Sequence, residues 1–589
     1  MCRLWDGISR VKSEGKDMKV KRIFSFCLVV MLLAGLLTGC GSAPKNATAA
    51  APLTAEEDAR LKEELQADID AILNTETEIV HADTYIAGET YTGTAYYVSN
   101  DGNDDNDGLT PETAWRTLKK VAEVNGFWGD APLLKAGDAV FFRRGDVFRM
   151  KEIGWDPYLA DEAALHLKVD GVTYSAYGEG EKPIITESTE NGSGAEKWNL
   201  VYEDGSGKKI WQYYRDMRDV SRLVLNDGEV LTPRVYEYYN ENGYISCEAT
   251  GWWQHEAEGV TLLDTLLPLE ESMSEDLTII SRPVRLEPES HWINGEVGPL
   301  YLRCDKGNPG ELYQSIEFTE YQLNGIIQLR ASDVVFDNIS FRCNGSAYMK
   351  SGWESGDWKE IKNTVIQNCE FAYGGCTVTF YREREDGALV VEVQGDGIYN
   401  IVRNTTIRNN YFHDGATSSV TYEGDNFDDK DAVNGYFHYL DNVSVNTNGI
   451  RLDSTADALK YLDSVKVCGN QVWNTGGMDQ GKLIYSEGSL VLMPNNYGEC
   501  VIEDNVFYGT KNGHAMNALL DIFLYNFESA GYTRPQFGNN IYVQYAGRNF
   551  GDFLYQVGET WAMDDPKLLT KAAKLLGDTT SQFYIIPTE

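Results

Sequence analysis

A short pattern of apolar and polar positions recurs through the second half of the chain. An apolar residue is followed two positions later by Asn, Gly or Asp, and three positions after that by a second apolar residue. The copies are Phe336–Phe341, Ile366–Phe371, Ile407–Phe412, Val467–Val472 and Ile502–Phe507. The apolar positions suit the interior of a stacked coil, in which Asn amides hydrogen-bond between successive turns. Each copy therefore predicts one strand–turn–strand corner.

The spacing of these copies is uneven, with intervals of 30, 41, 60 and 35 residues. Loops or further turns of the coil must therefore interrupt the repeat. Insertions of this kind usually gather on one face of a solenoid, and that face is where a solenoid binds its partner.

Two longer helices are predicted outside the repeat. One begins near Thr54 after an Ala/Pro-rich tether, and Thr54 with Glu57 fits a capping box. We interpret this helix as a solvated spacer. The other runs from about Pro566 to Leu576 and is expected to belong to a cap that protects the last open sheet edge.

The order of elements in residues 94–149 is specific. A strand, an acid-rich loop and a short helix after Pro111 are followed by two further strands. This order resembles the N-terminal cap of right-handed parallel β-helix proteins of the pectate-lyase-like superfamily. The resemblance implies an all-β fold, a right-handed parallel β-helix (solenoid) with a β-rich insertion and short capping helices.

Alternating polarity and turn signals in residues 187–330 predict an antiparallel β insertion. Its stretch "GPLYLRCDKGNPGELYQSIE" resembles an insertion of β-helix glycoside hydrolase-like proteins. The expected organisation is a signal peptide with lipobox (1–40), tether and spacer helix (41–93), N-terminal cap and first coils (94–186), insertion (187–330), β-helix core (331–530) and C-terminal cap (531–589).

The N-terminus reads as a secretion signal. Basic residues after Met18 precede an apolar run over 23–37, which is short for a membrane span. Leu-Thr-Gly-Cys, ending at Cys40, resembles a bacterial lipobox, whose Cys is lipidated. The alternative is an ordinary membrane anchor. We expect Met18 to be the true start and the protein to be extracytoplasmic and lipid-anchored to the bacterial cell membrane.

Charge and cysteine content exclude several classes. The chain has 589 residues and a net charge of −39, which argues against nucleic-acid binding and makes a polyanionic substrate dependent on bridging cations. Beyond Cys2, Cys27 and Cys40, seven scattered cysteines contain no CxxC pair, which argues against a zinc site and a disulfide framework. Their pairing stays open, and a monomer is expected.

Acidic residues in 395–426 suggest chemistry. "GDGIYNI" followed by "IRNNYFHDGATSSVTYEG" resembles a recurrent pair of rungs in β-helix glycoside hydrolase-like proteins. The resemblance places Asp396 between two glycines and Asp414 in the acidic turn. Where relatives often carry Thr-His-Gln, this chain has Thr-Tyr-Glu ending at Glu423.

Glycoside hydrolysis needs two carboxyl groups, and adjacent rungs lie about 4.8 Å apart. We therefore expect Asp396 and Asp414 to act as acid and as base or nucleophile, with Glu423 as third candidate. Asp425 and Glu370 lie on rungs that could stack beside them. The alternative is that these acids only shape turns, since Asp suits Asx-turns.

Further residues are candidates for substrate binding: His413, Asp425, Arg408, Trp253 and Trp353. His413 could orient a base or a ligand, or it could be a packing residue. Aromatic rings suit the C–H faces of sugars, although each Trp could equally pack within its own loop. The expected substrate is a polysaccharide or oligosaccharide, and a hydrolase of this kind requires no cofactor.

Two other functions remain open. A calcium-dependent polysaccharide lyase or epimerase would need Ca²⁺ and a Lys or Arg base of lowered pKa. Weak candidate ligands lie in the acidic loop at Asp101, Asp104, Asp105 and Asp107, which lacks the distal Glu of an EF-hand and could simply staple its turn. A non-catalytic glycan-binding or adhesive solenoid is the third possibility.

Overall fold

The computed structural model describes residues 50–588 with gaps. The gaps are 128, 130, 154–163, 236–238, 241–254, 257–259, 262–267, 283–296, 321–324, 346, 352–360, 375–376, 383–388, 395–397, 401–402, 416–417, 424–434, 454–461, 476–487, 493–496, 512–517, 523–530 and 553–560. The expected signal peptide and Cys40 lie outside the described residues, as do four candidate site residues: Asp396, Asp425, Trp253 and Trp353.

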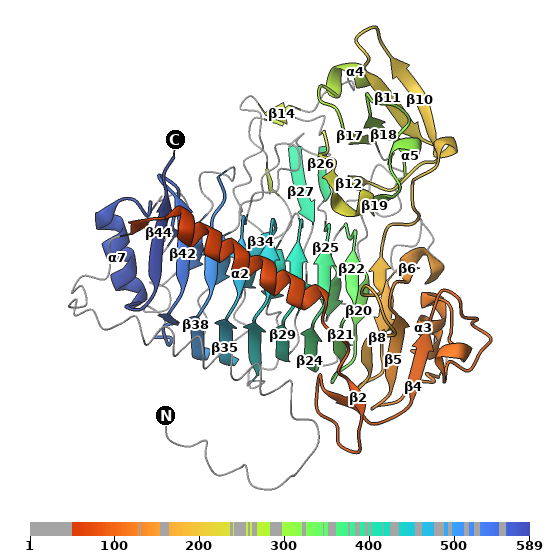
Figure 1. Ribbon diagram of the computed structural model, residues 1–589, viewed down its shortest axis with the longest axis horizontal. Coiled ribbons are helices and arrows are strands. Elements are labelled where there is room, and N and C mark those ends of the chain that lie inside the picture. The colour runs from red at the N-terminus through yellow and green to blue at the C-terminus, as the bar shows by residue number, and fades with distance from the viewer. Residues whose placement is uncertain are drawn as a thin grey trace. The chain divides into compact units, whose positions relative to one another are not determined.

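Three long parallel sheets form the body of the described chain (Figure 1). Sheet 1 consists of β4 (Ala95–Val98), β5 (Ala139–Arg143), β8 (Thr173–Tyr177), β21 (Val335–Asp337), β24 (Lys362–Gln367), β29 (Arg403–Arg408), β32 (Tyr436–Leu440), β35 (Leu462–Cys468), β38 (Tyr497–Glu503) and β41 (Gln536–Gly538).

Sheet 2 consists of β6 (Val147–Arg149), β9 (Ile184–Thr186), β22 (Ser340–Arg342), β25 (Glu370–Ala372), β30 (Tyr411–His413), β33 (Val443–Val445), β36 (Gln471–Trp473), β39 (Val506–Tyr508), β42 (Ile541–Tyr545), β44 (Gln582–Ile586) and β1 (Ala51–Pro52). Sheet 3 consists of β7 (Leu165–Leu167), β20 (Ile327–Leu329), β23 (Met349–Ser351), β28 (Ile398–Asn400), β31 (Ser418–Glu423), β34 (Asn448–Asp453), β37 (Leu490–Leu492), β40 (Leu520–Ile522) and β43 (Gly551–Asp552).

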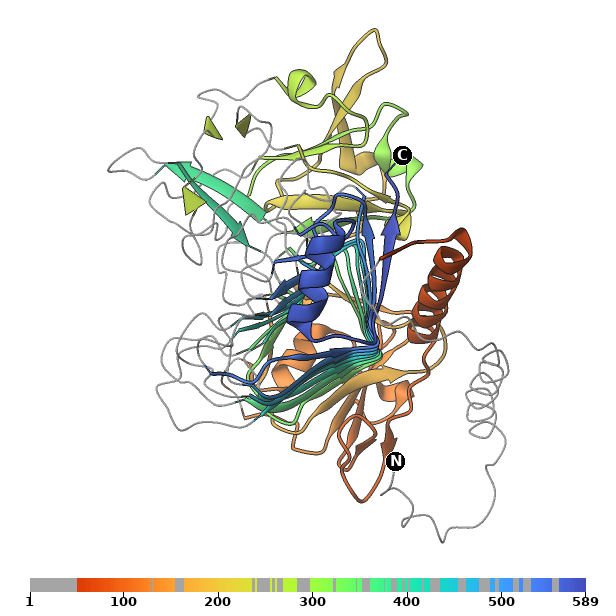
Figure 2. The ribbon, with the colours of Figure 1, turned by 90° about the vertical axis from the view of Figure 1, so that its left-hand side faces the viewer.

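From β20 to β43 the chain visits the three sheets in a fixed rotation, and each strand pairs in parallel with its counterpart one turn later. Ile366 pairs with Ile407 in sheet 1, and Phe371 pairs with Phe412 in sheet 2. Figure 2 shows the strands of successive turns stacked behind one another. The structure is therefore all-β with long parallel sheets, as the repeat predicted.

The repeated apolar positions fill the interior of the coil. Phe341, Phe371 and Phe412 are buried and stack in a column, with ring centroids 5.2 and 4.7 Å apart. Residues on either side of each Phe point to the outer face, because side chains alternate along a strand. This alternation decides which residues of sheet 2 can form a site.

The turn from sheet 1 to sheet 2 is built by asparagine. Asn368 and Asn409 adopt the left-handed conformation, at a φ of 54° each, which Asn tolerates better than most residues. The next position carries a buried ladder of Asn410, Asn442, Asn470, Asn505 and Asn540. In that ladder each Oδ1 accepts a hydrogen bond from the backbone N–H one turn earlier, at 2.9 to 3.0 Å. The predicted amide bonds between turns are confirmed.

The uneven intervals have two explanations. A turn of the coil that the pattern missed, β32 and β33, lies between the copies at 407 and 467. An antiparallel hairpin of β26 (Thr377–Arg382) and β27 (Leu389–Gln394) leaves the coil between β25 and β28. The β32–β33 turn keeps the spacing of the repeat but carries Ser444 where the other copies have an apolar residue, and the hairpin does not repeat the pattern at all.

The helix α2 (Ala55–Leu73) begins at Thr54, whose hydroxyl accepts a hydrogen bond from the Glu57 N–H as expected. Our interpretation of it as a solvated spacer was wrong. Leu61 is 1% exposed and packs with Trp473 and Tyr508 on the outer face of sheet 2, across which the helix lies (Figure 1). An apolar stripe on an otherwise charged helix drives this docking.

The helix α7 (Pro566–Leu576) is present at the expected residues. Asp565 caps its N-terminus and Gly577 ends it in the left-handed conformation, at a φ of 68°. Its buried face, which includes Leu569 and Leu576, joins the main core of the coil. Sheet 2 continues past β42 to β44 and then to β1, so residues 51–52 form its last strand.

Between β9 and β20 the chain forms antiparallel sheets with their own core. Their strands are β10 (Trp198–Glu203), β11 (Lys209–Tyr213), β12 (Val220–Leu225), β13 (Val230–Leu231), β17 (Ile279–Ser281), β18 (Leu300–Arg303) and β19 (Ile316–Glu320). Arg149 of the coil forms an ion pair with Glu317 of this insertion at 2.7 Å.

The remaining elements are short. They are β2 (Val80–His81), β3 (Thr90–Tyr91), η1 (Pro111–Thr113), α3 (Leu118–Val124), η2 (Met150–Ile153), η4 (Ala195–Lys197), η5 (Asn226–Gly228), β14 (Tyr239–Asn240), β15 (His255–Glu256), β16 (Val260–Thr261), α4 (Leu269–Ser272) and α5 (Pro309–Leu312). Within the described part of the chain, no helix has both the length and the apolar character that crossing a membrane requires.

The cysteines that the structure describes are free thiols: Cys304, Cys343, Cys369, Cys468 and Cys500. All except Cys468 are buried, as expected for small apolar residues. Cys247 and Cys376 lie outside the described residues.

Candidate functional site

The connections between sheets differ in regularity. Each turn from sheet 1 to sheet 2 in the repeat has the same short Asn-containing form, whereas the connections into and out of sheet 3 vary widely in length. The large insertion, the β26–β27 hairpin and Asp414 all belong to connections from sheet 2 to sheet 3. Asp396 precedes β28 by two residues, in the equivalent connection one turn earlier. Variation on a regular scaffold is typical of a functional edge.

His413 lies between two carboxylates at this edge. Its Nδ1 is 2.8 Å from Oδ2 of Asp414, and its Nε2 is 3.1 Å from Oε1 of Glu370. Glu370 comes from the neighbouring strand β25 and His413 from β30, and both flank the buried Phe column on the outer face of sheet 2. Only 8% of the His413 side chain and 6% of the Glu370 side chain are exposed.

Arg342 completes this group from the preceding strand, β22. Its Nη2 is 2.9 Å from Oε2 of Glu370, and its Nη1 is 3.1 Å from Oδ1 of Asp227 in the insertion. The hydroxyl of Ser340 also donates to Oε2 of Glu370. Arg342, Glu370, His413 and Asp414 are called the charged cluster below.

Contacts within the charged cluster shift the pKa values of its members. Burial disfavours the charged form of Glu370, but Arg342 and the hydrogen bond from His413 outweigh it and hold the pKa of Glu370 far below its usual range. Burial likewise opposes a charge on His413, yet its bonds to Asp414 and Glu370 raise its pKa. Each ring nitrogen faces a carboxylate oxygen, an arrangement that favours the charged imidazolium over the neutral ring.

Asp414 is the most exposed member, with 24% of its side chain accessible. Burial opposes its charge, but the hydrogen bonds from His413 and from Asn446, at 3.0 Å to Oδ1, lower its pKa. Its backbone is left-handed, at a φ of 53°, and Arg222 donates to its carbonyl oxygen at 2.6 Å. An ionised, oriented carboxylate of this kind can act as a base or nucleophile and cannot act as a proton donor.

The remaining predicted residues are placed as follows. Glu423 ends β31, where its backbone pairs with that of Asp453. Arg408 ends β29 in sheet 1, and its Nε and Nη2 both donate to Oε1 of Gln367, at 3.0 and 2.7 Å. The structure therefore holds Arg408 on a different sheet from His413.

The acidic loop is used for local hydrogen bonds. Asp104 accepts from the backbone and hydroxyl of Thr117, at 3.0 and 2.6 Å, at the start of α3. Asp107 accepts from Leu109, and Asp101 pairs with Arg143 at 2.7 Å. The fourth candidate, Asp105, receives no side-chain hydrogen bond from a described residue, and its N–H donates to a neighbouring Asn. Among described residues, no group of three His, Cys, Asp or Glu could hold a metal ion.

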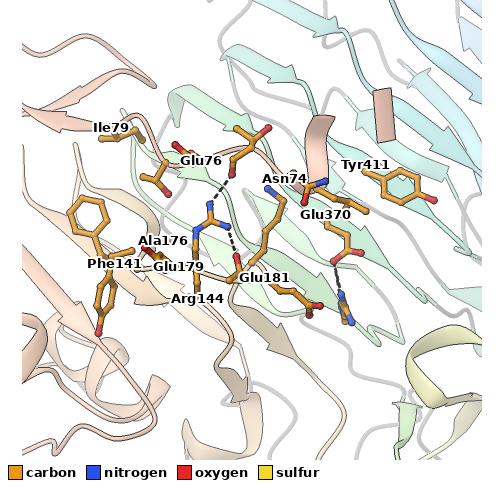
Figure 3. A pocket seen from close by; sticks show the side chains of 18 of the residues that line it. Asn74, Glu76, Ile79, Phe141, Arg144, Ala176, Glu179, Glu181, Glu370 and Tyr411 are labelled. Atoms are coloured by element: carbon orange, nitrogen blue, oxygen red, sulfur yellow. Dashed lines mark hydrogen bonds and ion pairs between the residues drawn. The ribbon is translucent and has the colours of Figure 1, made fainter. Parts of the chain in front are cut away.

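A cavity of about 1380 Å³ lies beside the charged cluster, between the outer face of sheet 2 and the chain that follows α2 (Figure 3). Arg342, Glu370 and His413 line one part of it. Sequence reasoning missed Arg342 and the cavity itself because it did not predict that α2 docks on sheet 2. The available signal was register: Arg342, Glu370 and His413 each stand next to the buried Phe of their own copy, so all three belong to the same outer face.

A search of curated proteins finds one distant relative of this chain. Over 170 residues it is 28% identical to a lacto-N-biosidase from Bifidobacterium longum subsp. longum. The match covers 28% of this chain and 9% of the relative, so the chain spans about a tenth of that protein's length. No family model matches the chain.

Solved structures with some likeness to the chain include two carbohydrate-related proteins. One, described as a glycoside hydrolase, is 11% identical with a TM-score of 0.38, covering 78% of this chain and 95% of that one. The other, described as the complex of XylC with xylose, is 12% identical with a TM-score of 0.36, covering 79% and 70% of the two chains.

Proposed function

We propose that this protein is a glycoside hydrolase that cleaves a polysaccharide or oligosaccharide. The observation that carries the proposal is the 170-residue similarity to a lacto-N-biosidase. The net charge of −39 agrees with a neutral glycan better than with a polyanion. The acidic edge beside sheet 3 supplies the carboxyl groups that such a reaction requires.

The proposal includes a fold and a cellular location, both of which follow the expectations from the sequence. The coil of three parallel sheets is a right-handed parallel β-helix. Lipidation at Cys40 anchors the protein to the bacterial cell membrane outside the cytoplasm, and the protein acts there as a monomer. Analysis of the native N-terminus by mass spectrometry tests the lipidation, because a diacylated Cys40 has a diagnostic mass and an unprocessed chain does not.

Asp414 is the base or nucleophile of this hydrolase. Its lowered pKa keeps it ionised, and His413 and Asn446 hold its two oxygens in place. Its partner must donate a proton to the leaving oxygen, and Glu370 cannot do so because Arg342 and His413 keep it ionised. We assign the proton donor to Asp396, with Glu423 as the second candidate.

The test is hydrolysis by the full chain of a panel of neutral oligosaccharides, with products identified by mass. Asp414→Asn and Asp396→Asn should each lower the rate by about 10²-fold or more. The matched control is Asp504→Asn, because Asp504 also sits at a left-handed turn, at a φ of 59°, but in a connection from sheet 1 to sheet 2. Equal rates for all three variants, or no released reducing ends from the native chain, would contradict the proposal.

A polysaccharide lyase is the second candidate, and Lys182 is the residue that favours it. Burial lowers the pKa of Lys182 to about 8, within the range of a lyase base, and its side chain lines the cavity. Its ammonium donates to Oδ1 of Asn338, which holds it in place. A lyase would generate an unsaturated product with new ultraviolet absorbance and would lose activity in Lys182→Met, whereas a hydrolase would add the mass of water to its products.

A further inference from the structure

The end of the cavity away from the charged cluster is lined by aromatic rings: His81, Tyr91, Tyr97, Phe141 and Tyr177. Figure 3 shows Phe141 at this end, with Glu370 and Tyr411 at the other. The ring centroids of Tyr97 and Tyr177 are 5.0 Å apart, and those of Tyr91 and Phe141 are 5.6 Å apart. The cavity therefore has an aromatic end and a charged end.

The aromatic end is preformed by the fold. Tyr97 and Phe141 pair in register on adjacent strands of sheet 1, so both rings stand on the outer face. Tyr91, Tyr97 and Tyr177 are half-buried, which leaves part of each ring accessible. Rings fixed in this way lose little entropy when a ligand stacks on them.

The rim between the two ends is polar. Arg144 joins its two sides, with Nη2 donating to the Thr75 carbonyl at 2.8 Å and Nη1 to the Gly180 carbonyl at 3.2 Å. Exposed carboxylates of Glu76, Glu179 and Glu181 line the same rim (Figure 3). These acceptors stand beside rings that offer flat apolar faces.

The combination selects among ligand classes. A hydrocarbon ligand would strip water from the charged rim without replacing its hydrogen bonds. A polyanion would meet the rim carboxylates and a net charge of −39. A neutral sugar has an apolar C–H face for the rings and hydroxyl donors for the carboxylates. We propose that this cavity is a saccharide-binding groove, in which Tyr97 and Tyr177 stack against a sugar ring.

The volume supports more than one sugar unit. At about 1380 Å³ the cavity exceeds the roughly 300–1000 Å³ of common small-molecule sites. A chain bound on the aromatic end would therefore extend toward Arg342 and Glu370. Because the ligand class is that of the proposed hydrolase, the inference rests on the proposed function for its choice of a neutral glycan.

The experiment is calorimetric titration of the full chain with maltohexaose, xylohexaose and chitohexaose. For each hexasaccharide that binds, Tyr97→Ala and Tyr177→Ala should weaken binding by about 3- to 10-fold each. Tyr97→Phe keeps the ring and should retain the native affinity. Tyr214→Ala removes a Tyr that is 49% exposed in the insertion, outside the cavity, and should also leave the affinity unchanged.

Thermal unfolding of each variant separates lost binding from lost folding. If Tyr97→Ala and Tyr177→Ala fold and still bind with native affinity, or if none of the three hexasaccharides binds, the inference is overturned. Weakened binding in a protein that hydrolyses no glycan would support the groove and refute the proposed hydrolase. Glycan hydrolysis by the native chain, with unaltered binding in both variants, would support the proposed hydrolase and refute the groove.

Discussion

His413 donates through Nδ1 to the carboxylate of Asp414, its neighbour in the chain, at 2.8 Å. The same imidazole reaches Glu370 of the preceding turn with its other nitrogen, at 3.1 Å. One side chain therefore ties a buried strand residue to an acid at the variable edge of the coil. This tie has consequences for stability that can be measured.

Replacing His413 by Gln should destabilise the protein in a pH-dependent way. The pKa of His413 is raised in the folded state, so its stabilisation is complete below the unfolded pKa of about 6.5 and is lost as the pH rises through the folded pKa. We expect a loss of about 1–3 kcal/mol near pH 6 that shrinks toward pH 9. Urea unfolding at several pH values measures it, and a constant loss across that range would contradict the ion-pair assignment.

Replacing Glu320 by Gln should stabilise the protein relative to the native chain, and this gain should grow as the pH rises. Glu320 is fully buried, its Oε1 accepts from the Thr189 hydroxyl at 2.7 Å, and burial raises its pKa. The unfolded carboxyl ionises near pH 4.3, so the native protein loses stability as the pH rises from there toward the folded pKa. Gln does not ionise, so the Glu320→Gln variant does not lose stability for this reason.

Relative to the native chain, Glu320→Gln should therefore gain free energy of unfolding between pH 4 and pH 7. The control is Glu311→Gln, because Glu311 is exposed in the insertion. Parallel stability profiles for the native chain and Glu320→Gln would show that the buried carboxyl is ionised in the folded state.

The docking of α2 should contribute substantially to stability. Leu61 is 1% exposed against Trp473 and Tyr508, and Leu61→Ala should cost about 2–4 kcal/mol. Leu133→Ala is the matched control, because Leu133 is 48% exposed. Chemical denaturation compares the two, and equal effects would mean that α2 does not stay docked in solution.

The asparagine ladder should be sensitive to single deletions. Asn470 accepts from the Asn442 N–H at 2.9 Å and donates to the Tyr439 carbonyl at 3.0 Å, both in a buried setting. Asn470→Ala leaves these groups unsatisfied and should cost about 1–3 kcal/mol. Asn199→Ala, at an exposed position of β10, should cost little, and a similar cost for both would argue against the ladder as a stabilising element.

The sequence predicted those parts of the fold that repeat or begin with a capping signal. The buried Phe column and the Asn bonds followed from a fixed spacing, and α7 followed from its Pro start and apolar face. The β32–β33 turn was missed because Ser444 replaces the second apolar residue of the pattern. The docked position of α2 was missed because no local signal identifies the distant strands that it packs against.

The candidate site was predicted only in outline. Asp414 was chosen from a resemblance, His413 as its neighbour and Glu370 as an acid on a rung that could stack beside it. The structure brings these three together and adds Arg342 from the strand before Glu370. Contacts between turns depend on how many residues each connection contains, and those lengths are irregular around sheet 3. The pairing of β22, β25 and β30 on sheet 2 explains why Arg342, Glu370 and His413 lie together.

The last strand of sheet 2 is β1, which pairs in parallel with β44 through Ala51 and Tyr584. During synthesis, residues near position 51 emerge long before those near position 584. The seat for β1 and much of the surface beneath α2 therefore does not exist until nearly the whole polypeptide has been made. A segment made early is therefore among the last to reach its final place, as the outermost strand of sheet 2.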